Sequence, residues 1–151
     1  MKTIRPLILA ALIAPAAALA ADTSPAVAPD PVHEQATSAI ARKDWPRAQA
    51  LLREALAANP SSADYHNLYA YAIRKSANPD MSLVFKHYNE ALRLDPKHRG
   101  AHEYIGEAYL MVGNVAKAKE HLGALDKLCF FPCEEHRELK RAISEYEAKR
   151  K

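Results

Sequence analysis

The chain has 151 residues, a length that corresponds to a single domain, and its formal net charge at pH 7 is +3. The N-terminal segment described below contains one lysine and one arginine, and without them the chain has 19 basic and 18 acidic residues. A nearly neutral chain of this kind does not favour nucleic acid as a partner. The four glycines form no phosphate-binding loop, and no Ser/His/Asp or Cys/His set has the surroundings of a known catalytic family. We therefore expect neither an enzyme nor a bound cofactor.

Residues 1–21 have the three parts of a secretory signal peptide. Two basic residues begin the segment, residues 7–14 are apolar, and Ala-Leu-Ala at 18–20 offers a cleavage site between small side chains. This segment is too short to span a membrane, and no later apolar run approaches spanning length. We therefore expect an exported protein without a membrane span, whose residues 22–30, with two of the ten prolines, form a flexible linker.

Helix start and stop signals follow along the rest of the chain, and no stretch alternates with the period of a strand. Asn59-Pro60 and Asp95-Pro96 each end a helix, because a residue before proline avoids the helical conformation. Helix starts are expected at Asp30-Pro31, at Asp44, at Ser61 with Asp64 as an approximate capping box, and at Asn78-Pro79.

Residues 98–128 show the clearest pattern, two apolar helices joined at Gly113-Asn114. Gly113 suits the end of the first helix, because glycine enters the left-handed region without steric cost. Gly106 stands in the middle of that helix, where glycine costs about 1 kcal/mol relative to alanine. We therefore expect another helix to pack closely against Gly106.

The same pattern recurs along the chain at a nearly constant period. Ala70 precedes Gly106 by 36 residues, and Tyr88 precedes Leu122 by 34. The order of small and aromatic residues in residues 30–132 resembles the tetratricopeptide repeat family, a two-helix unit of about 34 residues, although His102 stands where that family often has tryptophan. The resemblance implies an all-α fold, an α-solenoid of three helix pairs over residues 31–133.

A solenoid of this kind exposes the apolar face of its last helix pair unless something covers it. Residues 134–151 have the pattern of such a capping helix, with an apolar stripe at Leu139, Ala142, Ile143 and Tyr146. Glu135, Glu145 and Lys149 are among the polar residues expected to face outward. An amphipathic membrane or partner helix is the alternative, but the stripe is short and poor in aromatic residues for membrane binding.

In tetratricopeptide proteins the first helix of each pair lines a groove that receives a partner segment. The resemblance implies a partner-binding face, with Tyr71 as an aromatic anchor and a neighbouring arginine as a donor to a peptide backbone or carboxylate. It does not include the double-basic clamp with which some relatives hold a terminal carboxylate, and a plain solvated surface is the alternative. The residues carried over to this face are Asn67, Tyr71, Arg74, Lys75, Glu103, Glu107 and Leu110.

The only two cysteines, Cys129 and Cys133, lie in the turn before the capping helix. An even number of cysteines in an exported protein favours a disulfide, which here would set the angle of the capping helix, with Phe130 and Phe131 packed beneath it. Two alternatives remain, a copper or redox site in which His136 supplies a third ligand, and free thiols.

A second possible metal site, His98 with His102 at helical spacing, is disfavoured because Gly100 lies at the helix start between them. We expect His98 to cap or solvate a turn and His102 to fill a half-buried repeat position.

Residues 64–75 and 95–135 also resemble a group of small exported bacterial proteins that have three such repeats and the same LCFFPCEE turn. This resemblance implies a location in the bacterial periplasm. Two functional hypotheses follow: a module that binds another protein or peptide segment, and a copper or thiol-redox accessory protein that uses the two cysteines. The sequence leaves the partner and the oligomeric state open.

Overall fold

The computed structural model describes residues 30–150, so the expected signal peptide and nearly all of the expected linker lie outside the described residues. This part of the chain contains seven helices and no strand. They are α1 (Pro31–Ala41), α2 (Trp45–Ala58), α3 (Ala63–Arg74), α4 (Met81–Leu94), α5 (Arg99–Met111), α6 (Val115–Leu128) and α7 (Glu134–Ala148).

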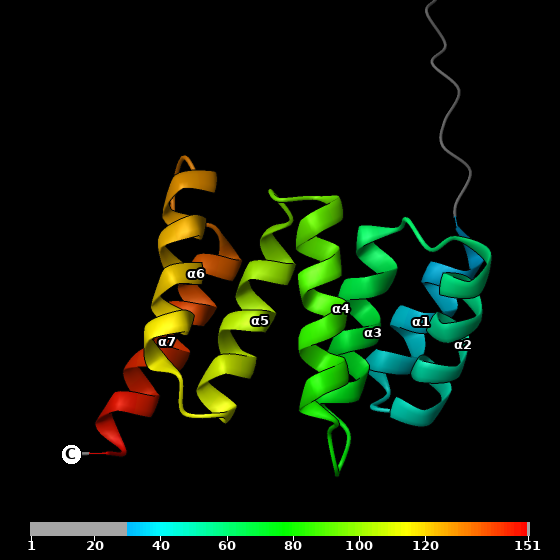
Figure 1. The fold of residues 1–151 in the computed structure, drawn as a ribbon, viewed down its shortest axis with the longest axis horizontal. Coiled ribbons are helices and arrows are strands. Elements are labelled where there is room, and N and C mark those ends of the chain that lie inside the picture. Colours follow the sequence, from blue (N-terminus) through cyan, green and yellow to red (C-terminus); the bar gives the residue numbers. More distant parts are fainter. Residues whose placement is uncertain (1–29, 151) are drawn as a thin grey trace, which may run out of the picture.

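The helices form an all-α solenoid, as the sequence predicts (Figure 1). Three antiparallel pairs, α1 with α2, α3 with α4 and α5 with α6, stack side by side, and α7 packs against α5 and α6. No described helix is long and apolar enough to cross a membrane.

Side-chain caps begin all of the described helices except α7. Asp30 accepts hydrogen bonds from the backbone N–H groups of the next turn at 3.0 and 3.1 Å, and Asp44 caps α2 in the same way at 3.2 Å. Two expected starts were wrong by one or two residues. Ser62 rather than Ser61 caps α3, because its hydroxyl accepts from the N–H of Tyr65 at 3.2 Å, and Asp80 rather than Asn78 caps α4.

The turn between the two helices of a pair reverses through a left-handed residue. Gly113 adopts φ 78° after α5, as expected for a glycine at that place. Lys43 occupies the same place after α1 with φ 59°, although a side chain makes this conformation unfavourable. In both turns the following N–H reaches back to a helix carbonyl, from Asp44 to Ala39 at 2.9 Å and from Asn114 to Tyr109 at 2.8 Å.

The core consists of three apolar clusters that follow one another along the solenoid. Small residues such as Ala36 and Ala48 fill the first cluster, and Tyr88 and Ile105 fill the second. The third cluster contains Leu139, Leu125 and Ile143, so α7 covers the end of the solenoid as a capping helix.

The close contact expected at Gly106 is present, and its partner is α7. A Cβ atom at Gly106 would lie 2.7 Å from both δ-carbons of Leu139, a separation that real contacts do not reach. The glycine therefore allows α7 to approach α5 at this point.

The turn between α6 and α7 agrees with the expectation for its cysteines and differs for its phenylalanines. The sulfur atoms of Cys129 and Cys133 lie at disulfide distance, with their Cα atoms 5.8 Å apart. Phe130 and Phe131 do not pack beneath the capping helix, because they are 94% and 76% exposed. Three residues between the cysteines form too short a turn to reach the core, which Leu139 and its neighbours already fill.

Candidate functional site

Helices α3, α5 and α7 lie in succession, and together they line two hollows. The first hollow, of about 290 Å³, lies beside the starts of α5 and α7, and we call it the acidic hollow. The second, of about 700 Å³, lies beside the ends of the same helices, and we call it the mixed hollow. The acidic hollow is lined by Asn67, Leu68, Gly100, Glu103, Tyr104, Glu134, Glu135 and Glu138, and the mixed hollow by Arg74, Lys75, Glu107, Leu110, Met111, Ala142, Glu145, Tyr146 and Lys149.

Six of the seven residues expected on the partner-binding face line one of these hollows. Asn67 and Glu103 line the acidic hollow, and the mixed hollow receives Arg74, Lys75, Glu107 and Leu110. The seventh, Tyr71, lines neither hollow. It is partly buried, with its ring centroid 4.7 Å from that of Tyr104 and 6.2 Å from that of Trp45. The binding role of all seven remains a prediction.

Arg74 joins α3 to α4 and α5 rather than facing solvent. Its side chain is 5% exposed, and its Nη2 atom lies 2.7 Å from Oε2 of Glu107, close enough for an ion pair although no hydrogen bond is aligned along that contact. Its Nε donates to the hydroxyl of Tyr88 at 3.3 Å, and the guanidinium lies 5.4 Å from the ring centroid of Tyr71. A partner that uses Arg74 as a donor would therefore share it with these groups.

Glu103 lies at the acidic hollow with little compensation for its charge. The residue is 8% exposed, and burial, followed by the negative charges of Glu107, Glu135 and Glu138, raises its pKa to about 8. Beside it, Asn67 is 5% exposed, and its Oδ1 atom has no hydrogen-bond partner among residues 30–150. Burial of such polar groups costs free energy unless they form hydrogen bonds with a partner.

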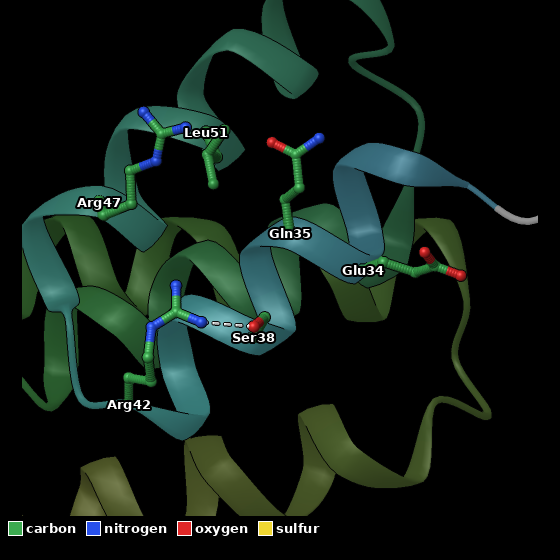
Figure 2. Close-up of a pocket in the computed structure, with 6 residues that line it drawn as sticks. All are labelled: Glu34, Gln35, Ser38, Arg42, Arg47 and Leu51. Carbon is green, nitrogen blue, oxygen red and sulfur yellow. Dashed lines mark hydrogen bonds between the residues drawn. The ribbon is translucent and has the colours of Figure 1, made fainter.

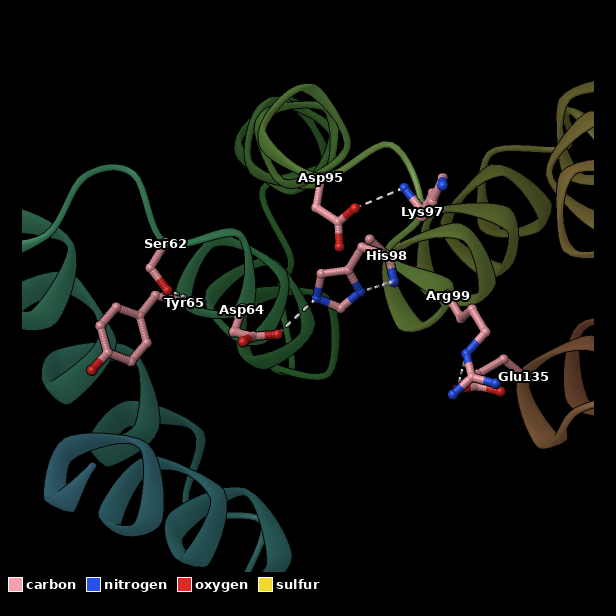
Figure 3. Close-up of polar contacts among 9 residues, drawn as sticks. Ser62, Asp64, Tyr65, Asp95, Lys97, His98, Arg99 and Glu135 are labelled. Carbon is pink, nitrogen blue, oxygen red and sulfur yellow. Dashed lines mark hydrogen bonds and ion pairs between the residues drawn. The ribbon is translucent and has the colours of Figure 1, made fainter. Parts of the chain in front are cut away.

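Sequence reasoning missed the contribution of α7 to this face. Glu135, Glu145 and Lys149, expected to face outward, each line one of the hollows. The helix follows α5 as the first helix of a fourth repeat would, so the inner positions of the repeat could have been carried over to it. At one edge of the face, His98 lies 3.0 Å from Asp64, and Arg99 lies 3.6 Å from Glu135, which links α3, α5 and α7 in turn (Figure 3).

The histidines form two equivalent pairs that sequence reasoning also missed. Nδ1 of His66 lies 2.8 Å from Nδ1 of His87, and Nδ1 of His102 lies 3.0 Å from Nδ1 of His121. The first histidine of each pair also bonds a proline carbonyl through Nε2, at 3.0 and 3.1 Å. A signal was present, since the first members are 36 residues apart and the second members 34, as in the repeat itself.

The proline carbonyls determine which ring nitrogens carry protons. A carbonyl oxygen only accepts, so Nε2 of His66 donates and its Nδ1 is left as an acceptor for the Nδ1–H of His87. Burial, then the neighbouring histidine, lowers the pKa of His87 and of His121 to about 4. His98 takes part in neither pair, and it caps α5 by accepting from the N–H of Ala101 at 3.2 Å.

The residues of the copper hypothesis make other contacts in the structure. With both sulfur atoms at disulfide distance, Cys129 and Cys133 offer no thiolate to a metal. Nε2 of His136 instead lies 2.7 Å from a carboxylate oxygen of Asp126. In the part of the chain that the structure describes, no three His, Cys, Asp or Glu residues are placed to hold a metal ion.

A further hollow, of about 380 Å³, lies on α1 and α2 at the other end of the solenoid (Figure 2). Arg42 donates there to the hydroxyl of Ser38 at 2.6 Å, and Arg47 lies on the neighbouring helix. All of its polar lining residues are exposed, so it has no buried polar group that a ligand would satisfy. It is therefore a weaker candidate than the face made by α3, α5 and α7.

Comparison with known proteins shows similarity at the level of structure. No family model and no curated protein matches the sequence. The solved structure of the TPR2B domain of yeast Sti1, in a complex with pHsp70, is similar with a TM-score of 0.68 and 21% identity, over 78% of this chain and 94% of that one. The Sgt2 TPR domain from Aspergillus fumigatus is similar with a TM-score of 0.67 and 22% identity, over 80% of each chain. The chain therefore has the fold of a tetratricopeptide repeat (TPR) domain.

Proposed function

We propose that this protein is a protein–protein interaction module of the bacterial periplasm that binds an extended segment of a partner along the face made by α3, α5 and α7. The observation that carries the proposal is the arrangement of the two hollows. They follow one another along α5, and α3 and α7 contribute to both. An extended segment lying along α5 would therefore contact all three helices.

The polar character of this face supports recognition of a peptide. Backbone amides need hydrogen-bond partners, and the two hollows present carboxylates, an amide and amines beside the apolar surfaces of Leu110, Met111 and Tyr146. Met111 is 53% exposed and lines the mixed hollow, so it offers a partner an apolar surface to contact. A solved structure of this fold, the Sti1 domain, is a complex with pHsp70, which supports a binding role for the fold.

The periplasmic location rests on the N-terminal segment and on the resemblance to small exported bacterial proteins. Cell fractionation of a bacterial host that produces the full chain tests it directly. Recovery in the periplasmic fraction with loss of the first 21 residues would support export, and a full-length cytoplasmic product would contradict it.

Partner capture from a periplasmic extract tests the binding face. Tyr71→Ala removes a large aromatic surface beside the mixed hollow, and we expect it to weaken capture by at least about fivefold, or about 1 kcal/mol. Lys75→Glu reverses an exposed charge of the same hollow and should also weaken capture.

The matched controls are Lys117→Ala and Lys140→Ala, which change exposed lysines of α6 and α7 outside both hollows. Circular dichroism checks that each variant keeps its helices. Equal capture by all four variants would mean that partners bind elsewhere, and the exposed Phe130 and Phe131 of the cysteine turn would be examined next.

A further inference from the structure

We propose that the acidic hollow holds a single cationic side chain, a lysine or an arginine, of the partner segment; this inference rests on the proposed function. Four carboxylate side chains from two helices line this hollow, and no basic residue among residues 30–150 lines it. These acidic residues are Glu103, Glu134, Glu135 and Glu138. The hollow therefore has the charge that attracts a cation.

The carboxylates are not equally compensated within the protein. Arg99 lies 3.6 Å from Glu135, and Arg141 forms an ion pair with Glu138, in both cases through exposed arginines. Glu134 and Glu135 also lie in the first turn of α7, where the helix dipole favours negative charge. Glu103 has none of this support, because it lies within α5 and makes no ion pair among the described residues.

Buried polar groups provide an observation that does not depend on the number of acidic residues. Glu103 is 8% exposed, and Asn67 beside it is 5% exposed. Among the described residues, Glu103 has no ion-pair partner and the Oδ1 atom of Asn67 has no hydrogen-bond partner. The Oδ1 atom of Asn67 is an acceptor without a donor, and the Glu103 carboxylate is a second acceptor whenever it is ionised. An ammonium or guanidinium group carries several N–H donors and no acceptor, so it suits both at once.

The lining of the hollow favours a side chain over a metal ion. Within residues 30–150 no three acidic, histidine or cysteine side chains are close enough together to hold a metal. Leu68 and Tyr104 give the hollow apolar walls, which suit the aliphatic stem of lysine or arginine.

The electrostatics of Glu103 agree with this assignment. Its pKa of about 8 arises from burial first and then from Glu107, Glu135 and Glu138, whereas Arg74 acts in the opposite direction. A cation in the hollow would favour the ionised carboxylate and lower that pKa. Binding should therefore strengthen as the pH rises through about 8, and a proton should be released on binding below that pH.

Peptide display tests the inference with the full chain as bait. Random linear peptides on phage are selected at pH 8.5, where Glu103 is mostly ionised. We expect the selected peptides to share a lysine or arginine at one position. One selected peptide is then synthesised in two forms, with the basic residue and with an uncharged replacement, norleucine for lysine or citrulline for arginine.

Variants locate the charge that the peptide recognises. Glu103→Gln and Glu138→Gln remove charges of the hollow at nearly constant size, and Glu54→Gln removes an exposed charge on α2 as a control. The basic peptide should bind the parent protein at least about tenfold more tightly than its uncharged form. This preference should shrink in the first two variants, remain in the control, and weaken with added salt.

The outcomes separate this inference from the proposed function. If selected peptides lack a shared basic residue, or if their preference survives Glu103→Gln and Glu138→Gln while Lys75→Glu weakens their binding, the face binds peptides and the cationic assignment is wrong. If no peptide is selected at all, the proposed function and the assignment are overturned together.

Discussion

The two histidine pairs predict that acid weakens this fold well before general acid denaturation. His87 and His121 each donate through Nδ1 to a second histidine, and each has a pKa lowered from 6.5 to about 4. The folded state therefore binds fewer protons than the unfolded state between these values. The stabilisation that the two neutral rings give the folded state is complete above about pH 6.5, and it is lost as the pH falls toward 4.

The size of the effect follows from the same two values. A pKa difference of about 2.5 corresponds to about 3 kcal/mol for one ring that keeps its full effect. Both rings are only partly buried, so solvent screens part of it, and we expect about 1–2 kcal/mol for each pair. The free energy of unfolding should thus fall by about 2–4 kcal/mol between pH 7 and pH 4.5 through these histidines.

Urea unfolding at pH 7, 6, 5 and 4.5, followed by circular dichroism, measures this loss. His87→Asn and His121→Asn keep a donor near the position of Nδ1 but do not titrate in this range. The double variant should lose much less stability on acidification than the parent, whereas His33→Asn, which belongs to neither pair, should behave like the parent. A parent protein equally stable at pH 7 and 4.5, or a double variant with the same pH dependence as the parent, would refute the reasoning.

Three further predictions concern stability. Gly106→Leu should lower the free energy of unfolding by about 1–3 kcal/mol or more, because the new side chain overlaps Leu139. An unchanged melting temperature would show that α7 does not approach α5 as described. Lys43→Gly should raise stability by about 1 kcal/mol in thermal unfolding, since φ at this exposed residue is 59°; a lower melting temperature would contradict this. Reduction of the bond between Cys129 and Cys133 should cost about 2 kcal/mol and increase hydrogen exchange first in α7, and simultaneous loosening of all helices would argue against a local role.

The structure and the sequence agree best where the controlling interactions are local. A side chain at Asp44 caps the helix that begins at the next residue, and Gly113 supplies the left-handed turn that ends α5. Such interactions span only a few residues, so they can be recognised without the rest of the fold. The errors of one or two residues at Ser61 and Asn78 arose where a second residue competent to cap stands within two positions.

The candidate site was only partly predictable for a related reason. The inner face of α3 and α5 follows from the repeat, and six of the seven expected residues line the hollows. The acidic face of α7 was missed because the place of that helix depends on how the turn at residues 129–133 directs the chain. The same turn carries Phe130 outward, since a short closed loop cannot reach the core.

The sequence by itself determined the seven helices, their order and the repeat that stacks them, because caps, breakers and apolar periodicity act over one or two turns. The tertiary structure alone decided which polar groups lost water and which found partners. Glu103 is buried against α7 without a cation, whereas His87 meets His66 from a neighbouring helix and forms a hydrogen bond. Burial and pairing of this kind depend on the distances between packed helices, and spacing along the chain does not define those distances.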